Sequence, residues 1–390
     1  MNPYVARILI PPKESFFLLG PRGTGKSTWL LHAYPRATRI DLLQPEQERL
    51  YLAAPERLRE IVEVAPEGSV IILDEIQRAP GLLPVVHSLI EEGKNIQFIM
   101  TGSSARKLRR EVGNLLGGRA LLRLMPPSFF AVELKASFRL ETALKVGLIP
   151  MIYEAKDPEE KILNYVGTYL REEIIAEGLV RQVGNFARFL EILSFSHGQV
   201  LNVNDIAREA LVKRTTVDNY LEILEDLLIA FRLPVFTRRA KRALIQHPKF
   251  YYFDVGVYRS LRPKGPLDKE AELEGPALEG LVAQHLRAWV QAQKETHQLC
   301  FWRTRSQVEV DFVIYGPKGF WAIEVKRGLN VHGQDVKALH LFREEYPEAI
   351  PLFLYLGKEQ RKIDGIDCIP LREFLLHLHP ERIIHKELGK

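Results

Sequence analysis

The sequence has 390 residues, of which 46% are hydrophobic and 26% charged, a composition that indicates a globular, soluble protein. This length is too great for one ordinary core and predicts two or three domains. No apolar run is long enough to span a bilayer, so we expect no membrane association. The formal net charge of +5 weakly favours a polyanionic partner.

The start of the chain lacks the basic, apolar and small-residue regions of a signal peptide, in that order. The sequence contains two cysteines, Cys300 and Cys368, which cannot form a disulfide framework and have no metal-ligand spacing. A reducing environment suits such a chain. We therefore expect a cytoplasmic protein.

Residues 20–27 read GPRGTGKS, between the apolar run 15–19 and an apolar-periodic segment that opens at Thr28. Strand, glycine-rich loop and helix are the context of a phosphate-binding loop. The glycines let successive amide hydrogens face the phosphate oxygens, Lys26 would contact the β- and γ-phosphates, and Ser27 would ligate Mg²⁺. The sequence thus predicts ATP and Mg²⁺ as cofactors. The predicted nucleotide contacts are Gly20, Pro21, Arg22, Gly23, Thr24, Gly25, Lys26, Ser27 and Thr28.

A second nucleotide element follows at residues 69–75, SVIILDE, where a short apolar run ends in two carboxylates. This pattern is typical of a buried parallel strand with its acidic pair at the carboxyl edge. Asp74 would hold the Mg²⁺, and Glu75 would polarise the water that attacks the γ-phosphate.

Residues 39–42 and 96–100 are further candidate strands, and the second is followed by hydroxyl side chains. Ser103 is our candidate for a hydroxyl that senses the γ-phosphate; a simple Gly-Ser turn is the alternative. Strands that alternate with helical segments predict a parallel α/β sheet that binds its ligand at the carboxyl edge.

Residues 74–108 and 115–130 resemble the prokaryotic AAA-type ATPases that carry a C-terminal domain of unknown function related to restriction endonucleases. The resemblance implies a homo-oligomer, such as a hexameric ring. It also implies an arginine that acts on the ATP of a neighbouring subunit. Our candidate is Arg119, which follows two glycines, and its competitors are Arg22, Arg106 and Arg123.

The middle of the chain predicts helices over 165–177 and 186–195, and then a winged helix over 201–236. Asn204 is expected to cap a short helix over 205–210. Thr215 or Thr216 is expected to cap a longer helix that runs to about Leu228. The β-like sequence that follows would form the wing.

Basic residues at two places in this module are candidates for contact with DNA phosphates, although acidic residues follow on the second helix and a solvated loop is the alternative. We expect such contacts to position the backbone without reading its sequence. The candidates are Lys213 and Arg214 at the start of the second helix and Arg238, Arg239, Lys241 and Arg242 near the wing.

Residues 308–315 and 320–326 are strand-like and are joined by a Gly-Pro-Lys-Gly turn, which predicts a hairpin. Side chains alternate along a strand, so the hairpin can bring Asp311, Glu324 and Lys326 together. Two carboxylates would bind Mg²⁺ or Mn²⁺, and the lysine would orient or activate the attacking water.

This hairpin resembles the catalytic core of the PD-(D/E)XK nucleases, which include restriction enzymes and junction resolvases. These enzymes often add a glutamate from the preceding helix, and Glu279 lies in a matching place; Glu309 is expected on the same face as Asp311. The resemblance implies that Glu279, Asp311 and Glu324 are metal ligands. Nuclease-like folds can also keep the fold and lose the cleavage.

The predicted fold class is therefore α/β: a parallel P-loop ATPase sheet, a helical and winged-helix module, and an α/β restriction-endonuclease-like domain. The predicted domains are residues 1–127, 128–248 and 249–390. The predicted function is ATP-driven processing of duplex or branched DNA, by binding or by cleavage. The alternative is a regulatory ATPase switch whose inactive nuclease-like domain binds a protein partner.

Overall fold

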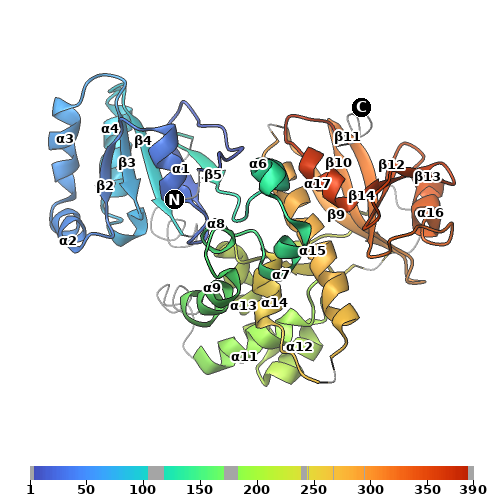
Figure 1. The fold of residues 1–390 in the computed structure, drawn as a ribbon. Coiled ribbons are helices and arrows are strands. Elements are labelled where there is room, and N and C mark those ends of the chain that lie inside the picture. Colours follow the sequence, from blue (N-terminus) through green and yellow to red (C-terminus); the bar gives the residue numbers. More distant parts are fainter. Residues whose placement is uncertain are drawn as a thin grey trace. The chain divides into compact units, whose positions relative to one another are not determined.

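The computed structural model describes residues 4–103, 118–170, 183–238, 244, 246–266, 268–293 and 295–384. Arg106, Arg239, Lys241 and Arg242 lie outside these described residues. The chain divides into two compact units, one made of residues 6–127 with 225–228 and one made of residues 128–224 and those from 229 onward. Figure 1 shows the elements of both units.

The first unit contains the predicted parallel sheet, with five strands in the order β2-β3-β4-β1-β5. β4 separates β1 from β3, so the chain crosses over between strands that are not neighbours. The sequence predicted four of the strands to within two residues of their ends. The strands are β1 (Phe16–Leu19), β2 (Thr38–Asp41), β3 (Val70–Asp74), β4 (Gln97–Gly102) and β5 (Leu121–Leu124).

Helices cover both faces of this sheet, because its strands carry buried side chains in alternation on each face. Trp29 and Leu30 of α1 pack against Phe16, Leu18 and other residues of one face. α2, α3 and α4 pack on the opposite face. Their bounds are α1 (Lys26–Ala33), α2 (Pro45–Ala53), α3 (Leu58–Val64) and α4 (Leu82–Glu91), with short 3₁₀ turns η1 (Pro55–Arg57) and η2 (Ile76–Arg78).

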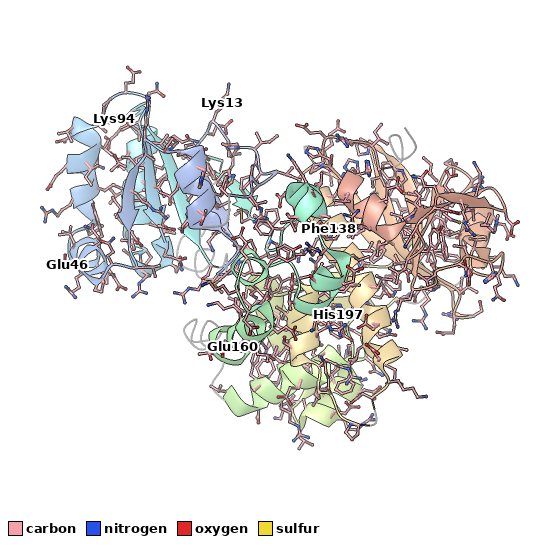
Figure 2. All side chains as sticks on the ribbon, viewed as in Figure 1. Lys13, Glu46, Lys94, Phe138, Glu160 and His197 are labelled. Carbon is pink, nitrogen blue, oxygen red and sulfur yellow. The ribbon has the colours of Figure 1, made fainter. Side chains whose placement is uncertain are left out.

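The second unit begins with a helical part that packs around α14 and α15. Phe138 and His197, marked in Figure 2, are both buried in it. The helices are α6 (Ala131–Leu134), α7 (Leu140–Val146), α8 (Pro150–Tyr153), α9 (Pro158–Asn164), α11 (Val183–Ser194), α12 (Val203–Ala210), α13 (Arg214–Asp226), α14 (Val255–Leu261) and α15 (Glu270–Gln291), with a 3₁₀ turn η3 (Lys135–Ser137) and a π-helical segment η4 (Tyr165–Leu170).

The predicted pair of short and long helices is present as α12 and α13, but the predicted caps are wrong. Asn202, not Asn204, caps α12, because its side chain accepts a hydrogen bond from the Asp205 amide. α13 begins at Arg214, before both threonines that were expected to cap it. A three-stranded antiparallel sheet follows in the order β6-β8-β7, with β6 (Gln199–Val200), β7 (Ala230–Leu233) and β8 (Lys249–Tyr252). The expected boundary at 248/249 falls immediately before β8, whose partner strands both precede it.

The C-terminal part of this unit is a six-stranded mixed sheet in the order β13-β14-β12-β11-β10-β9. α16 packs on one face, and α15 packs on the sheet through contacts such as Trp289 against Trp321, whose ring centroids are 6.0 Å apart. The elements are β9 (Gln298–Arg303), β10 (Glu309–Gly316), β11 (Gly319–Lys326), α16 (Lys337–Glu345), β12 (Ile350–Tyr355), β13 (Arg361–Ile363), β14 (Ile366–Pro370) and α17 (Leu371–His377). Within the described ranges, no helix combines the length and the apolar character needed to cross a membrane.

Candidate functional site

The phosphate loop joins β1 to α1 at the carboxyl edge of the parallel sheet, where ligands bind in such folds. Gly23 and Gly25 have φ angles of 77° and 86°, which a side chain would disfavour. The loop is braced from behind, because Arg7 donates hydrogen bonds to the carbonyl oxygens of Thr24 (2.9 Å) and Pro126 (2.8 Å). These two hydrogen bonds tie the phosphate loop to the segment that follows β5 through Arg7.

Lys26 is buried at the first position of α1, and its ammonium donates to the carbonyl oxygens of Gly20 (2.5 Å) and Pro21 (3.2 Å). Ser27 and Thr28 are exposed beside it, and Arg22 is half-buried. A lysine held over the loop by two neutral carbonyls can exchange these contacts for the stronger ones that phosphate oxygens offer.

Asp74 at the end of β3 receives three donors. The hydroxyl of Ser27 donates to its Oδ2 at 3.1 Å, the guanidinium of Arg39 forms an ion pair with the same oxygen, and the hydroxyl of Thr101 donates to Oδ1. Sequence reasoning missed Arg39. This residue lies on β2, which pairs with β3, and its partner in the register is Ile72, two residues before Asp74. The Ser27 hydroxyl and the Asp74 carboxylate lie together as a hydroxyl and carboxylate pair that suits Mg²⁺ beside a triphosphate.

Glu75 follows Asp74 in the left-handed conformation, with φ 60°, which is uncommon for a residue that carries a side chain. Its amide donates to the Thr101 hydroxyl at 2.9 Å, so Thr101 holds both acidic residues in place. The amide of the Gln77 side chain donates to Glu75 Oε2 and lies 3.5 Å from the Ser103 hydroxyl. Of the two hydroxyls near the end of β4, that of Thr101, within the strand, rather than that of Ser103, just after it, makes the direct contacts with Asp74 and Glu75.

Arg119 lies at the opposite edge of this sheet. It precedes β5, which runs parallel to β1, so it lies at the amino edge, whereas the phosphate loop follows the carboxyl end of β1. Arg119 is paired with Glu91 and its side chain is 40% exposed. Arg119 and the phosphate loop of the same chain therefore lie at opposite ends of two neighbouring parallel strands.

A second cluster of charged side chains lies in the C-terminal sheet, where β10 and β11 form the predicted hairpin. Phe312 pairs with Ile323, so the register places Asp311 opposite Glu324. The amide of Val325 donates to Asp311 Oδ2 at 2.9 Å. The Lys326 ammonium lies 2.6 Å from Glu324 Oε1.

The pairing of β10 with β9 shifts register between Val310 and Val313, and such irregularities redirect side chains beside many active sites. Asp311 lies within this shift. We call Glu279, Glu309, Asp311 and Glu324 the carboxylate cluster; the structure brings together all four of these residues, which the sequence had singled out.

Three members of this site were missed from the sequence: two come from β8, and the third is Arg303 of β9, whose guanidinium lies 3.2 Å from Glu309 Oε2. The Lys249 ammonium lies 2.8 Å from Glu279 Oε1 and 3.6 Å from Asp311 Oδ1, and it also pairs with Glu309. The Tyr251 hydroxyl donates to Glu279. The sequence does contain a signal for Lys249, because this lysine begins the apolar run KFYYF. A charged residue at the start of a buried strand needs a partner of opposite charge.

Burial shifts the acidity of the carboxylate cluster. It raises the pKa of Glu279 to about 7, against the opposing effect of Lys249. Burial and, after it, the neighbouring charge of Asp311 together raise the pKa of Glu324 to about 8. Glu324 Oε2 is a buried oxygen with no hydrogen-bond partner. Hard oxygen ligands and an unsatisfied carboxylate oxygen fit a divalent cation in chemical type.

The arrangement of the same cluster does not form a preassembled metal cage. In the part of the chain that the structure describes, no three His, Cys, Asp or Glu residues are grouped closely enough to hold an ion. The Lys249 ammonium lies among three of the carboxylates instead. Roles for Asp311, Glu324 and Lys326 in metal binding or catalysis therefore stay predictions.

The described candidates for DNA contact are on the surface. Lys213 and Arg214 are exposed at the start of α13, and Arg214 lies 3.9 Å from Asp218 in a weak ion pair. Arg238 is exposed, with its guanidinium 4.8 Å from the centroid of the Tyr315 ring. These positions are accessible to a polyanion.

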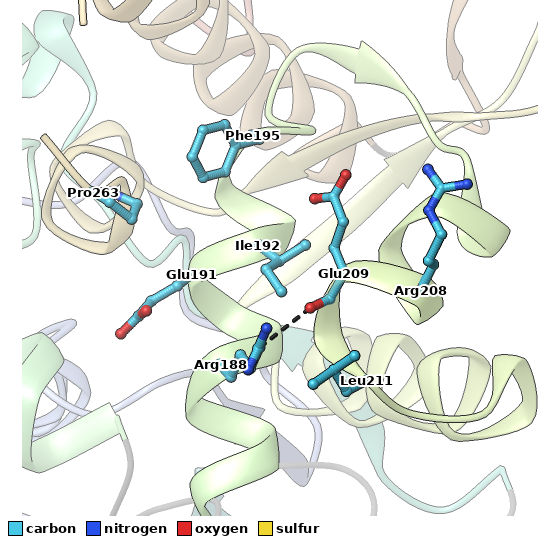
Figure 3. A pocket seen from close by; sticks show the side chains of 8 residues that line it. All are labelled: Arg188, Glu191, Ile192, Phe195, Arg208, Glu209, Leu211 and Pro263. Carbon is cyan, nitrogen blue, oxygen red and sulfur yellow. Dashed lines mark hydrogen bonds between the residues drawn. The ribbon is translucent and has the colours of Figure 1, made fainter. Parts of the chain in front are cut away.

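A hollow of about 490 Å³ lies between the C-terminal part of α11 and the C-terminal part of α12 (Figure 3). The side chain of Arg188, one of the lining residues, donates to the carbonyl oxygen of Glu209 at 3.2 Å. Arg262 stacks on the ring of Phe195 at its rim. The lining residues are Arg188, Glu191, Ile192, Phe195, Arg208, Glu209, Leu211 and Pro263.

Three sequence families match successive parts of the chain. Residues 12–132 match an AAA domain, residues 137–268 match a domain of unknown function (DUF8612), and residues 274–374 match a second domain of unknown function (DUF4143). An uncharacterized protein of Mycobacterium tuberculosis is 27% identical over 321 residues, covering 80% of this chain and 69% of that protein. An uncharacterized protein of Haemophilus influenzae is 24% identical over 340 residues, covering 82% and 80%.

Among solved structures, a Walker-type ATPase of Pyrococcus abyssi is 14% identical, with a TM-score of 0.39, and covers 64% of this chain and 91% of that one. A Vibrio cholerae protein is 10% identical, with a TM-score of 0.22, and covers 94% and 96%. The family match at residues 12–132 contains the phosphate loop, the Asp74–Glu75 pair and all five parallel strands. The N-terminal unit of this chain is a P-loop ATPase domain of the AAA type.

Proposed function

We propose that this protein couples ATP hydrolysis to the processing of DNA, and that its C-terminal sheet is a PD-(D/E)XK nuclease-like domain. The observation that carries the proposal is the meeting of Asp311, Glu324 and Lys326 on one hairpin, with Glu279 supplied by the preceding helix. Two carboxylates, a lysine and a helix glutamate are the residue types that the resemblance to the PD-(D/E)XK nucleases implies, and carboxylates can hold the metal ion that activates a water.

The chain's own residues would divide the work at this site. Asp311 and Glu324 would hold Mg²⁺ or Mn²⁺, which supplies a polarised water when bound. The Val325 amide fixes the Asp311 carboxylate, because it donates to Oδ2 at 2.9 Å. The Lys326 side chain is 51% exposed and paired with Glu324, so its ammonium can face both the carboxylates and a phosphate from solvent.

For DNA, the proposed interface is the helix-turn-helix formed by α12 and α13 with β7 and β8 as its wing. Exposed Lys213 and Arg214 at the start of α13 and exposed Arg238 after β7 support it. We propose that these cations, with Arg239, Lys241 and Arg242, contact backbone phosphates. Binding should therefore weaken steeply as salt rises.

The test of the proposed function uses purified full-length protein with Mg²⁺ or Mn²⁺ and linear, circular and four-way-junction DNA. We expect wild type to bind or cut at least one substrate, and Asp311→Ala to lose cleavage. Asp367→Asn, which changes an exposed carboxylate on β14 of the same sheet, is the matched control and should behave as wild type. Wild type that neither binds nor cuts any substrate contradicts the proposal; cleavage that survives Asp311→Ala would assign it to another site.

We further propose that the ATPase domains assemble into a ring, such as a hexamer, in which Arg119 contacts the ATP of the neighbouring subunit. Its place at the sheet edge opposite its own phosphate loop supports a role in trans. The pair with Glu91 would be exchanged for the γ-phosphate.

We expect Arg119→Ala and Lys26→Ala each to lose ATP hydrolysis, and a mixture of the two proteins to regain part of it. Mixed subunits combine an intact phosphate loop with an intact arginine at some interfaces. Steady-state phosphate release, measured against mixing ratio, checks this. Arg123→Ala, which removes an exposed arginine within β5, is the control and should hydrolyse ATP without a partner variant. A mixture as inactive as its components argues against Arg119.

A second candidate function is a regulatory ATPase switch whose nuclease-like domain is inactive and binds a protein partner. The observation that favours it is the Lys249 ammonium among the carboxylates where catalysis would need a metal ion. DNA binding without cleavage would not decide between the two. Absence of both binding and cleavage, together with normal ATP hydrolysis, favours the switch.

A further inference from the structure

Lys249 is a buried cation at the meeting point of separate elements. It opens β8, its side chain is 1% exposed, and its partners Glu279 on α15 and Glu309 and Asp311 on β10 come from elsewhere in the unit. A buried ammonium is stable only when carboxylates or other acceptors surround it. The ammonium thus supplies positive charge to the three carboxylates that surround it.

The charges of the site are nevertheless incompletely matched. With all four carboxylates ionised, Glu279, Glu309, Asp311 and Glu324 would face three cations, Lys249, Lys326 and Arg303, and one formal negative charge would be unmatched. The unmatched group is identifiable, because Glu324 Oε2 is buried without a hydrogen-bond partner. Exchange of the single charge of an ammonium for the double charge of a metal ion would balance the cluster and supply that oxygen with a ligand bond.

We propose that the Lys249 ammonium and a divalent cation compete for the carboxylate cluster, so that the ion binds only when the ammonium withdraws. The inference rests on the proposed function in treating Asp311 and Glu324 as cation ligands. Two cations that share one small set of carboxylates repel each other strongly in a buried site. A divalent ion also needs oxygens that Lys249 now engages.

Lys249 is suited to such an exchange. Its ammonium is carried on a flexible four-carbon stem, so the head group can leave while β8 keeps its pairing with β6 and β7. The same competition explains why carboxylates of the right type are present while no three of them are grouped around an ion position in the described residues. The protein's own ammonium engages the carboxylate oxygens that a divalent ion would need.

The test measures Mn²⁺ binding to the metal-free full-length protein without nucleotide or DNA, from the electron paramagnetic resonance signal of free Mn²⁺ and by calorimetry. We expect Lys249→Met to bind one Mn²⁺ at least tenfold more tightly than wild type, and to lose that binding when Asp311→Asn is added. Lys362→Met, which removes an exposed lysine of β13 in the same sheet, is the control and should match wild type.

A second variant covers the case in which Lys249→Met leaves too much buried negative charge to fold. Lys249→Gln combined with Glu279→Gln keeps the net charge of the site and retains three carboxylates, and we expect the same gain in Mn²⁺ affinity. Equal affinity in wild type and in both Lys249 variants, or weaker binding in the variants, would overturn the inference. The readout involves no DNA, so failure of wild type to bind or cut DNA removes the proposed function without touching this result.

Discussion

Replacing Glu75 with glutamine is expected to lower the rate of ATP hydrolysis by about 10²- to 10⁴-fold while nucleotide binding persists. Glutamine keeps the shape of the side chain but cannot accept a proton from the attacking water. The backbone of Glu75 is held by the Thr101 hydroxyl, and its side chain is held by Gln77, so the substitution should leave the position of residue 75 intact.

Two measurements separate the loss of chemistry from the loss of binding. Phosphate release gives the turnover, and titration with a fluorescent ATP analogue gives the dissociation constant. Glu46→Gln is the matched control, because Glu46 is an exposed carboxylate of α2 in the same unit (Figure 2). Turnover in Glu75→Gln equal to that of Glu46→Gln would remove Glu75 from the role of base.

The parts of the ATPase site that are contiguous in the chain were predictable from sequence. The phosphate loop carries its own glycines, lysine and hydroxyl within eight residues, and the strand before Asp74 is a short, almost unbroken apolar run. Local backbone requirements alone specify such a motif. The parallel direction of the strands was predictable because the strands alternate with helices along the chain.

Residues whose role depends on pairing between distant segments were not predictable in the same way. Arg39 reaches Asp74 only because β2 pairs with β3 in one register, and a shift of one residue would turn its side chain to the other face. Lys249 meets Glu279, Glu309 and Asp311 only because β8, α15 and β10 converge. Spacing along the chain contains no signal for such a meeting.

The choice between neighbouring residues of one type was also beyond the sequence. Asparagine is a good helix cap, so both Asn202 and Asn204 were candidates. Because α12 begins at Val203, Asn202 is the residue in the capping position. Thr101 and Ser103 both offer a hydroxyl near the end of β4, and the side chain of Thr101 is the one that reaches Asp74. The start of the helix in one case and side-chain direction in the other, rather than residue type, settle these choices.

One buried aspartate in the second unit is expected to control the stability of that unit. Asp254 is fully buried at the start of α14, and its carboxylate accepts from the amide of Gly256 (2.8 Å), the amide of Leu148 (2.9 Å) and the hydroxyl of Ser128 (2.7 Å). Burial raises the pKa of Asp254, although these donors oppose the shift. The residue joins segments that are more than 100 positions apart in sequence.

Asp254→Ala is expected to lower the free energy of unfolding of this unit by about 3–9 kcal/mol, because it leaves three buried donors without an acceptor at about 1–3 kcal/mol each. Asp157→Ala is the matched control: it also removes an aspartate cap, but an exposed one, and should cost about 1 kcal/mol. Urea unfolding followed by tryptophan fluorescence checks both, since Trp289, Trp302 and Trp321 are buried in the second unit. Equal losses for the two variants would mean that the cap alone matters and that the links from Asp254 to Ser128 and Leu148 add no stability.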